Sequence, residues 1–392
     1  MKLKTALFFV LVAVGLHIYL AIHYYGLSFG LLTSDSICNV SSKFNCDTIT
    51  ASNFSSVFGI PIAMYGAVTN SALAILIMIW ILGWSEDIPR HGRYTLWLSG
   101  LVATTSLVMG FISMFIIRSY CLFCIGAYIT SFLVAYFVYF AQESGVRSTT
   151  EYFIELFGHA KRYLIFLVMV PFFTFLAHKS YVKTKDATEL EQAIKSSLAD
   201  WNVSPLVDLS STTPIMSKGD QNAKMTIDEF ADFRCSHCLQ ANFGLKAFIN
   251  SHTSVKFNFY AFPLDGSCND AITGGGDGLS CYLAKNVFCA EKTAQQGWAI
   301  HDYIYSKQTQ ISSQGNIDFA KQELANAYNK FNISEEAQKI CLENPDTDAF
   351  IRAQAKAGAN AGVKGTPTLF INGKKLSRGH LLPILEAVYK SL

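Results

Sequence analysis

The chain has 392 residues, of which 51% are hydrophobic and 15% are charged, and its formal net charge is +2. Residues 1–178 hold 16 of the 60 Asp, Glu, Lys and Arg side chains, and residues 179–392 hold the other 44. Soluble domains carry about 25% charged residues. This division excludes a single soluble globule, a disordered chain and a fibrous repeat, and it predicts a membrane part followed by a water-soluble part. The near-neutral balance, without a basic stripe, does not support nucleic-acid binding.

Apolar runs in the first half predict five membrane-spanning helices. Most of them approach the ~20 residues that a spanning helix needs. The last is short and contains Pro171, so a tilted or partly interfacial helix is the alternative there. The first run follows two lysines, as a signal peptide does, but its core is long and further spans follow, so we interpret it as an anchor. The runs comprise residues 5–25, 60–83, 95–117, 121–140 and 163–178.

Basic residues in the short loops predict the orientation. If the N-terminus is cytoplasmic, the inner side holds seven Lys and Arg residues, and the outer short loops hold only Lys43 and Arg118. Five spans then place the 26–60 loop and the C-terminal half outside, where disulfides persist. Ten cysteines fall on that side or at that face: Cys38, Cys46, Cys121, Cys124, Cys235, Cys238, Cys268, Cys281, Cys289 and Cys341.

Four of these cysteines form two pairs beside the membrane. Cys121 and Cys124 begin the fourth span, where a helix N-terminus favours a thiolate and a lipophilic quinone can approach. Cys38 and Cys46 lie on a polar loop whose flexibility suits a relay by thiol–disulfide exchange, which requires sulfur–sulfur contact. The alternatives are a static loop disulfide for the second pair and simple packing between helices for the first.

The first half resembles the vitamin K epoxide reductase (VKOR) family over about residues 5–140. The resemblance implies that Cys121 and Cys124 form the quinone-facing active-site pair, with Cys124 nearest the quinone. It also implies that Cys38 and Cys46 form a shuttle pair. The matching motifs are Cys38-x7-Cys46, Ser52 six residues later, Phe58-Gly59-Ile60-Pro61 at the entry to the second helix, and Cys121-Leu-Phe-Cys124-x3-Tyr128.

The same resemblance implies that Ser52 and Tyr128 hold or polarise the quinone. A hydroxyl group at such a position can stabilise the negative charge that a quinone carbonyl gains on reduction. The alternatives are an N-cap for Ser52 and an interfacial or interhelical aromatic for Tyr128.

In the second half, residues 181–204 predict a polar helical linker, and an α/β pattern begins at about residue 205. The pattern predicts strands over 225–233 and 255–262, a helix over 239–249 and a largely helical stretch from 279 to about 360. A strand and turn over 365–373 and a final helix over 380–391 complete it.

A strand, a C-x-x-C motif and a helix follow one another at Cys235-Ser236-His237-Cys238, which is a redox signature. At the helix N-terminus Cys235 becomes the attacking thiolate, and Cys238 becomes the resolving thiol. His237 can place positive charge beside the thiolate, which favours the reduced form and makes the disulfide an oxidant. A zinc site is the alternative, but further ligands at fitting spacing are missing.

These elements resemble the thioredoxin fold with the helical insertion of the DsbA-like family, over about residues 205–392. The Ser-His dipeptide differs from the Pro-His dipeptide most familiar in that family, which puts the redox potential in doubt but not the type of chemistry. The resemblance implies that Thr366 and Pro367 contact the peptide substrate beside Cys235, and the Thr366–Pro367 bond can be cis. Further matches are Phe262-Pro263-Leu264-Asp265 and Lys364-Gly365-Thr366-Pro367.

The four remaining cysteines predict two structural disulfides with three possible connectivities. We favour Cys268–Cys281 and Cys289–Cys341. Residues 281 and 289 on one helix lie about 12 Å apart, which is too far for a bond between them.

The predicted fold is an α-helical membrane bundle, with a four-helix core and a fifth linking helix, followed by an α/β thioredoxin-fold domain with a helical insertion. The predicted domains are residues 1–180, the linker 181–204 and residues 205–392. The leading hypothesis is an enzyme that oxidises exported proteins with reduced cysteines and passes electrons to ubiquinone or menaquinone, without metal or nucleic acid. The resemblances favour a bacterial inner membrane and a periplasmic C-terminal domain. The alternatives are a thiol reductase or isomerase running the relay in reverse, and a non-catalytic membrane-anchored chaperone.

Overall fold

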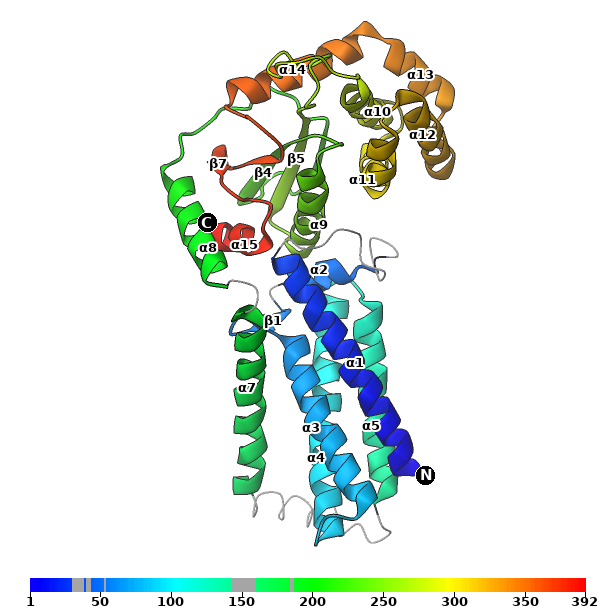
Figure 1. Cartoon of the computed structure of the whole chain (residues 1–392), viewed down its shortest axis with the longest axis vertical. Helices are drawn as coiled ribbons and strands as arrows, with labels where there is room; N and C mark the ends of the chain where they lie inside the picture. The colour runs from blue at the N-terminus through cyan, green and yellow to red at the C-terminus, as the bar shows by residue number, and fades with distance from the viewer. Residues whose placement is uncertain (30–38, 40–43, 53, 143–159, 184–186) are drawn as a thin grey trace. The chain divides into compact units, whose positions relative to one another are not determined.

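The structure is a computed structural model that describes residues 1–29, 39, 44–52, 54–142, 160–183 and 187–392 (Figure 1). Cys38 therefore lies outside the described residues. The chain divides into two compact units, the first built mainly from residues 1–188 and the second from residues 189–392.

The first unit is a bundle of long apolar helices. They are α1 (Lys2–Ser28), α3 (Ile62–Leu82), α4 (Ile88–Phe111), its π-helical continuation η1 (Ile112–Ile117), α5 (Leu122–Ala141) and α7 (Ala160–Lys183). In the described part of the chain, four helices are long and apolar enough to cross a membrane: α1, α3, α4 with η1, and α5. The fifth expected span falls on α7, which contains Pro171 and is not one of these four.

The interior of this bundle is packed, while its outer surface is also apolar. Leu73 and Ile77 of α3 and Val138 of α5 are buried in one cluster. Ile75 of α3 and Phe132 of α5 are exposed on the outside. A large exposed apolar surface is unfavourable in water and is expected where helices contact lipid. The first unit is therefore a membrane domain.

The segment around Cys46 corrects the expectation of a flexible polar loop there. Cys46 begins a short helix, α2 (Cys46–Ala51), all of whose residues are buried. Asn45 caps it, because the side-chain Oδ1 accepts a hydrogen bond from the Thr48 backbone N–H at 2.8 Å. A small hairpin, β1 (Ser56–Val57) and β2 (Ile60–Pro61), leads into α3. Cys46 is thus held in place rather than free to travel.

The second unit is built on a five-stranded sheet with the order β3-β5-β4-β6-β7. Its strands are β3 (Met216–Gly219), β4 (Met225–Ala231), β5 (Val255–Ala261), β6 (Thr368–Ile371) and β7 (Lys374–Leu376). β4 and β5 are parallel, and the other neighbours are antiparallel. The buried strands β4, β5 and β6 confirm the sequence prediction. The edge strands β3 and β7 were not predicted, because each has only three or four residues and lacks a continuous apolar pattern.

Helices surround this sheet, and most of them lie between β5 and β6 in the sequence. They are α8 (Ala187–Val203), α9 (Ser236–Ser251), α10 (Leu279–Ala294), α11 (Gly297–Gln314), α12 (Ile317–Phe331), α13 (Glu335–Glu343), α14 (Pro345–Asn360) and α15 (Leu382–Ser391). Figure 1 shows α10 to α13 gathered beside the sheet as one helical insertion. The second unit therefore has the thioredoxin fold with the predicted insertion.

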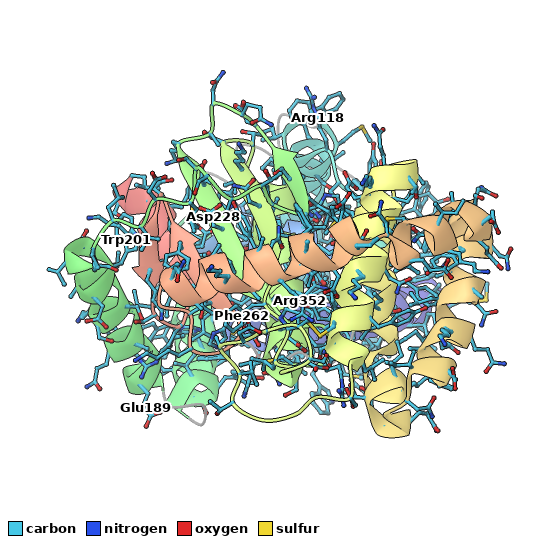
Figure 2. The ribbon with its side chains drawn as sticks, turned by 90° about the horizontal axis from the view of Figure 1, so that it is seen from above. Arg118, Glu189, Trp201, Asp228, Phe262 and Arg352 are labelled. Atoms are coloured by element: carbon cyan, nitrogen blue, oxygen red, sulfur yellow. A yellow bond between two sulfur atoms is a disulfide. The ribbon has the colours of Figure 1, made fainter. Side chains whose placement is uncertain are left out.

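Two side-chain contacts tie the flanking helices to the sheet. Trp201 of α8 donates its indole N–H to the Ile371 carbonyl at 3.2 Å, so the predicted linker helix packs against this unit. Gln354 of α14 accepts a hydrogen bond from the Ala261 N–H at the end of β5, at 2.7 Å. Figure 2 shows α14, with Arg352 labelled, crossing over the strands. These contacts fix the ends of β5 and β6.

Candidate functional site

Cys121 and Cys124 lie at the start of α5, as the sequence predicts. Cys121 is the N-cap residue, and its Sγ accepts a hydrogen bond from the Cys124 N–H at 3.1 Å. Both are free thiols, Cys121 buried and Cys124 partly buried. A sulfur that accepts a backbone N–H at a helix N-terminus is favoured as a thiolate.

A second sulfur approaches this pair from α2. The Sγ atoms of Cys46 and Cys121 are 3.1 Å apart and both residues are buried. The approach is aligned by the backbone, because the Asn45 N–H donates to the Tyr120 carbonyl at 2.9 Å. Cys46 belongs to a disulfide, and Cys38, which the sequence analysis pairs with it, is outside the described residues. Sulfur–sulfur contact is the geometric requirement for thiol–disulfide exchange.

A largely apolar cavity of about 320 Å³ lies within the first unit. This volume falls in the ~300–1,000 Å³ range of small-molecule pockets. Cys124 and Tyr128 both line it, as the family resemblance implies for residues beside a quinone. Other lining residues include His17, Leu20, Ile49, Asn70, Leu101, Met109 and Ala127.

Asn70 is a cavity residue that sequence reasoning missed. It is only 1% exposed, and its Nδ2 donates to the Gly66 carbonyl at 2.8 Å. Its buried Oδ1 has no hydrogen-bond partner within the described ranges. Buried polar atoms are normally hydrogen-bonded, so this oxygen fits a ligand that carries a hydroxyl group. A single amide on an otherwise apolar predicted span was the available signal.

Ser52 takes a different place from the one expected. It is buried at the C-terminal end of α2, where its Oγ donates to the Ile49 carbonyl at 2.7 Å. It is not among the residues that line the cavity, whereas Ile49 is. Ser52 thus caps α2 at its C-terminus, and any influence on a bound ligand passes through that helix.

In the second unit, Cys235 and Cys238 lie at the start of α9. Cys235 is the half-buried N-cap residue, and Cys238 is fully buried one turn into the helix. Their position follows from β4, which ends at Ala231 and delivers the chain to the helix N-terminus. Both are free thiols. The arrangement is the strand, C-x-x-C and helix that the sequence predicts.

The two thiols have opposite acidities. The pKa of Cys235 is lowered to about 5, chiefly by the hydrogen bond from the Cys238 thiol, with further contributions from Thr366 and from the first N–H groups of α9. Burial raises the pKa of Cys238 well above its usual value. At neutral pH these shifts favour the thiolate at Cys235 and the protonated thiol at Cys238.

The residues expected around Cys235 come from the segment before β6 and from the first turn of α9. The Sγ of Cys235 is 3.2 Å from the Thr366 carbonyl oxygen, and the Thr366–Pro367 bond is cis. His237 is exposed in the first turn of α9. The pKa of His380 is lowered, chiefly by burial and then by electrostatic interaction with His237 and Arg378. His380 was not predicted, because it is distant in the sequence and belongs to no motif.

Sequence reasoning also missed two buried polar residues that interact with the cysteine pair, Gln308 and Glu229. Gln308 of α11 donates its side-chain N–H groups to the carbonyls of Phe233 and Cys235, at 2.9 and 2.8 Å. Glu229 of β4 is only 3% exposed, and burial raises its pKa to about 8 despite the favourable charge of Lys218. A carboxyl group with that pKa can take up and release a proton near neutral pH. The sequence signal for Glu229 was an acidic residue within a predicted buried strand, whereas Gln308 stands among other polar residues and gave no signal.

Two disulfides join the remaining cysteines. The bonds are Cys268–Cys281 and Cys289–Cys341, the pairing that the sequence favours. Residues 281 and 289 lie on the same helix, α10, which prevents a bond between them. Both bonds lie within the helical insertion and the segment that leads to it.

Family models match both halves of the chain. The model described as the vitamin K epoxide reductase family matches residues 5–139, and a model described as thioredoxin matches residues 211–381. The curated relatives include Disulfide bond formation protein D of Bacillus subtilis, which is 25% identical over 41% of this chain and 68% of that protein. Na(+)/H(+) antiporter NhaA 3 of Salinispora tropica is 23% identical over 44% of this chain and 24% of the antiporter. The chain thus spans about a quarter of that antiporter's length.

Solved structures similar to the chain cover about half of it. The thiol-disulfide exchange protein alpha-DsbA2 from Wolbachia pipientis is 18% identical over 52% of this chain and 97% of that chain, with a TM-score of 0.38. Oxidised BdbD from Bacillus subtilis is 17% identical over 48% of this chain and 96% of that chain, with a TM-score of 0.35.

Proposed function

We propose that this chain, whose residues 5–139 match the vitamin K epoxide reductase family model and whose residues 211–381 match the thioredoxin model, makes disulfide bonds in exported proteins and passes the electrons to a membrane quinone. The chain is a thiol–disulfide oxidoreductase with a membrane domain. The observation that carries the finer proposal is the 3.1 Å approach of Cys46 to Cys121 beside a cavity that Cys124 lines.

The relay moves two electrons in each step, and each step breaks one disulfide and forms another. A substrate dithiol reduces the Cys235–Cys238 disulfide and becomes a disulfide itself. The Cys235 and Cys238 thiols then reduce the disulfide of Cys46 with Cys38. The resulting thiolate at Cys46 attacks Cys121 of the Cys121–Cys124 disulfide, and Cys124 leaves with the electron pair. Cys38 then attacks Cys46, which restores the Cys38–Cys46 disulfide and releases Cys121 as a thiolate. The Cys121–Cys124 disulfide would form again as its two electrons pass to a bound quinone.

The acidity of Cys235 supports the oxidising direction. A pKa of about 5 stabilises the thiolate of the reduced form. Stabilising the reduced form makes the corresponding disulfide a stronger oxidant. The relay therefore runs from the thiols of the substrate toward the membrane.

The cavity supports a quinone as the final acceptor. A bound quinone would accept two electrons and two protons there. Tyr128 can donate its hydroxyl hydrogen to a quinone oxygen, and the unpartnered Asn70 Oδ1 can accept one from the hydroxyl group of the reduced ring. Cys124, the leaving sulfur of the previous step, lines the same cavity. Ubiquinone and menaquinone both have the apolar chain that this site and its lipid surroundings favour.

The charge pattern of the loops supports a bacterial inner membrane with the N-terminus in the cytoplasm. In that orientation the thioredoxin domain faces the periplasm, where its protein substrates arrive with reduced cysteines. Holding both redox domains in one chain raises their effective concentration to about millimolar.

Quinone reduction by the purified full-length protein tests the relay. A reduced two-cysteine peptide and a soluble quinone are mixed with wild type and with Cys124→Ala, and quinone absorbance is followed. We expect turnover by wild type and none above background in the variant. Equal rates in both proteins would overturn the relay.

Two further outcomes separate the alternative functions. Cys235 and Cys238 that are largely reduced in growing cells would favour a reductase or isomerase over an oxidase. A chaperone without redox chemistry would form no mixed disulfide with exported proteins when Cys238 is replaced by Ala. We expect oxidised cysteines in wild type and trapped mixed disulfides in that variant.

A further inference from the structure

A buried pair of ionisable residues lies at the end of the membrane domain that carries Cys46. His23 of α1 and Asp47 of α2 are 7% and 4% exposed, and Nε2 of the imidazole is 2.7 Å from Oδ1 of the carboxylate. Ionisable residues within apolar spans are rare and are usually functional. Burying such groups carries a desolvation cost that their mutual interaction does little more than offset. Stability alone is therefore a poor reason for this pair.

The second oxygen of Asp47 binds the segment that leads to α2. Asn39 donates its Nδ2 hydrogen to Asp47 Oδ2 at 2.6 Å. The Oδ1 of Asn39 accepts a hydrogen bond from the Cys46 N–H at 2.9 Å. Asn39 follows Cys38 directly in the sequence, and Asp47 follows Cys46. The network therefore reaches the neighbours of both predicted shuttle cysteines.

Cys46 is also held from the side of α5. Ser119 donates its hydroxyl hydrogen to the Asn45 carbonyl at 3.3 Å, and the Asn45 N–H donates to the Tyr120 carbonyl at 2.9 Å. These bonds align residue 45 with the backbone that precedes Cys121. The pair of His23 and Asp47 supplies the remaining support, from α1.

We propose that His23 and Asp47 are positioning residues that hold the Cys46 sulfur in line with Cys121 for the exchange step. This inference rests on the proposed relay. In that step the Cys46 thiolate forms a bond to Cys121 Sγ, the Cys121–Cys124 bond breaks, and Cys124 carries away the electron pair. His23 and Asp47 form and break no covalent bond in this scheme. They act through Asn39 and through the backbone of α2.

Trapping the bond between Cys46 and Cys121 tests the alignment directly. In the full-length Cys38→Ala, Cys124→Ala protein, diamide takes two electrons and two protons from the remaining thiols. The rate of Cys46–Cys121 bond formation is measured by mass spectrometry of proteolytic peptides. Misplacement of a reacting group by about 1 Å costs about 100-fold. We expect His23→Ala and Asp47→Ala to slow trapping by about 10- to 100-fold.

A paired exchange of side chains separates positioning from general damage to the fold. Asp47→Asn alone leaves a single amide oxygen to accept from both His23 and Asn39, and Asn39→Asp alone sets two carboxylates together. The double variant Asn39→Asp, Asp47→Asn reverses donor and acceptor and restores that bond. We expect both single variants to trap slowly and the double variant to recover most of the rate. Failure of the double variant to recover, or a wild-type rate in Asp47→Ala, would overturn the proposal.

Two controls keep this result distinct from the relay itself. His91 of α4 donates a comparable hydrogen bond from its Nε2–H to the Leu76 carbonyl at 2.8 Å, away from the cysteines. His91→Ala should trap at the wild-type rate. Quinone reduction driven by dithiothreitol, which can reduce Cys121–Cys124 directly, should survive in His23→Ala. Its absence from wild type would contradict the quinone relay, whereas the trapping rates would still decide the positioning role.

Discussion

At the scale of single residues, the chemistry of the thioredoxin domain depends on two cysteine thiols whose pKa values the fold shifts in opposite directions. Cys235, half-buried at the first turn of α9, is stabilised as a thiolate by hydrogen bonds. Cys238, one turn further on, is buried and keeps its proton. Cys235 is thus suited to attack a disulfide, whereas Cys238 stays protonated until the mixed disulfide is resolved.

The acidity of Cys235 predicts the pH dependence of its reactivity. Its pKa falls from 9.0 to about 5 in the folded, reduced protein. We expect the rate of iodoacetamide alkylation at Cys235 to rise with pH around a midpoint near 5, with Cys235→Ser as the control that assigns the alkylated residue. A midpoint near 9 would contradict this.

The same shift has a consequence for stability with a definite sign. Between pH 5 and 9 the unfolded protein binds more protons at this residue than the folded protein does. The free energy of unfolding of the reduced form should therefore gain a contribution that is complete above pH 9 and is lost as pH falls through 5. In thermal unfolding of the reduced Cys235→Ser variant, the free energy of unfolding should not show this change between pH 5 and pH 9.

Glu229 predicts a kinetic effect on the resolving step. Burial raises its pKa to about 8, and it lies behind the cysteine pair. Because Cys238 must lose a proton before it attacks a mixed disulfide, we expect Glu229→Gln to slow resolution by about 10²-fold or more. Stopped-flow measurement of mixed-disulfide decay checks this, and the alkylation rate of Cys235 serves as the control. An unchanged decay rate would remove Glu229 from the mechanism.

At the scale of elements, each C-x-x-C motif uses a helix N-terminus, and each helix is held by its neighbours. α9 is fixed through Gln308 of α11, and α5 is aligned with α2 through Asn45. The helical insertion is in turn closed by disulfides. Since these bonds join buried cysteines of the insertion and of the segment before it, we expect them to stabilise the fold.

Removal of the Cys289–Cys341 bond tests that structural role. The bond closes a separation of 52 residues between α10 and α13. Replacing both cysteines by Ala should lower the free energy of unfolding by about 2–4 kcal/mol, because the unfolded chain gains conformational freedom. Urea unfolding followed by tryptophan fluorescence checks this. Peptide oxidation below the unfolding transition should persist, and its loss would indicate a redox role instead.

At the scale of the whole molecule, the proposed relay requires both redox domains to work on the outer face of the membrane. We expect a membrane-impermeant maleimide to label Cys235 in Cys238→Ala on intact cells. Glu86→Cys, in the short loop between α3 and α4, should be labelled only after permeabilisation. The reverse pattern would overturn the proposed orientation.

The sequence by itself determined the two-part layout and much of the chemistry. The low content of charged residues in the first half indicates the membrane domain, because lipid excludes ionised groups. The C-x-x-C motifs at the starts of helices indicate the candidate nucleophiles, because a local helix N-terminus is enough to activate a thiol. The rise of one helix excluded one of the three disulfide connectivities, and the structure decided between the other two in favour of the expected pairing. All these arguments are local along the chain.

Only the tertiary structure decided which side chains meet. The contact of Cys46 with Cys121 joins residues 75 positions apart. Asn70 and Glu229 gained their roles from burial, which periodicity alone does not assign. α2 was missed because a six-residue helix is stabilised by its cap and its packing rather than by its own propensity. Desolvation and long-range contacts arise only when distant segments of the chain fold together, so the sequence alone did not predict them.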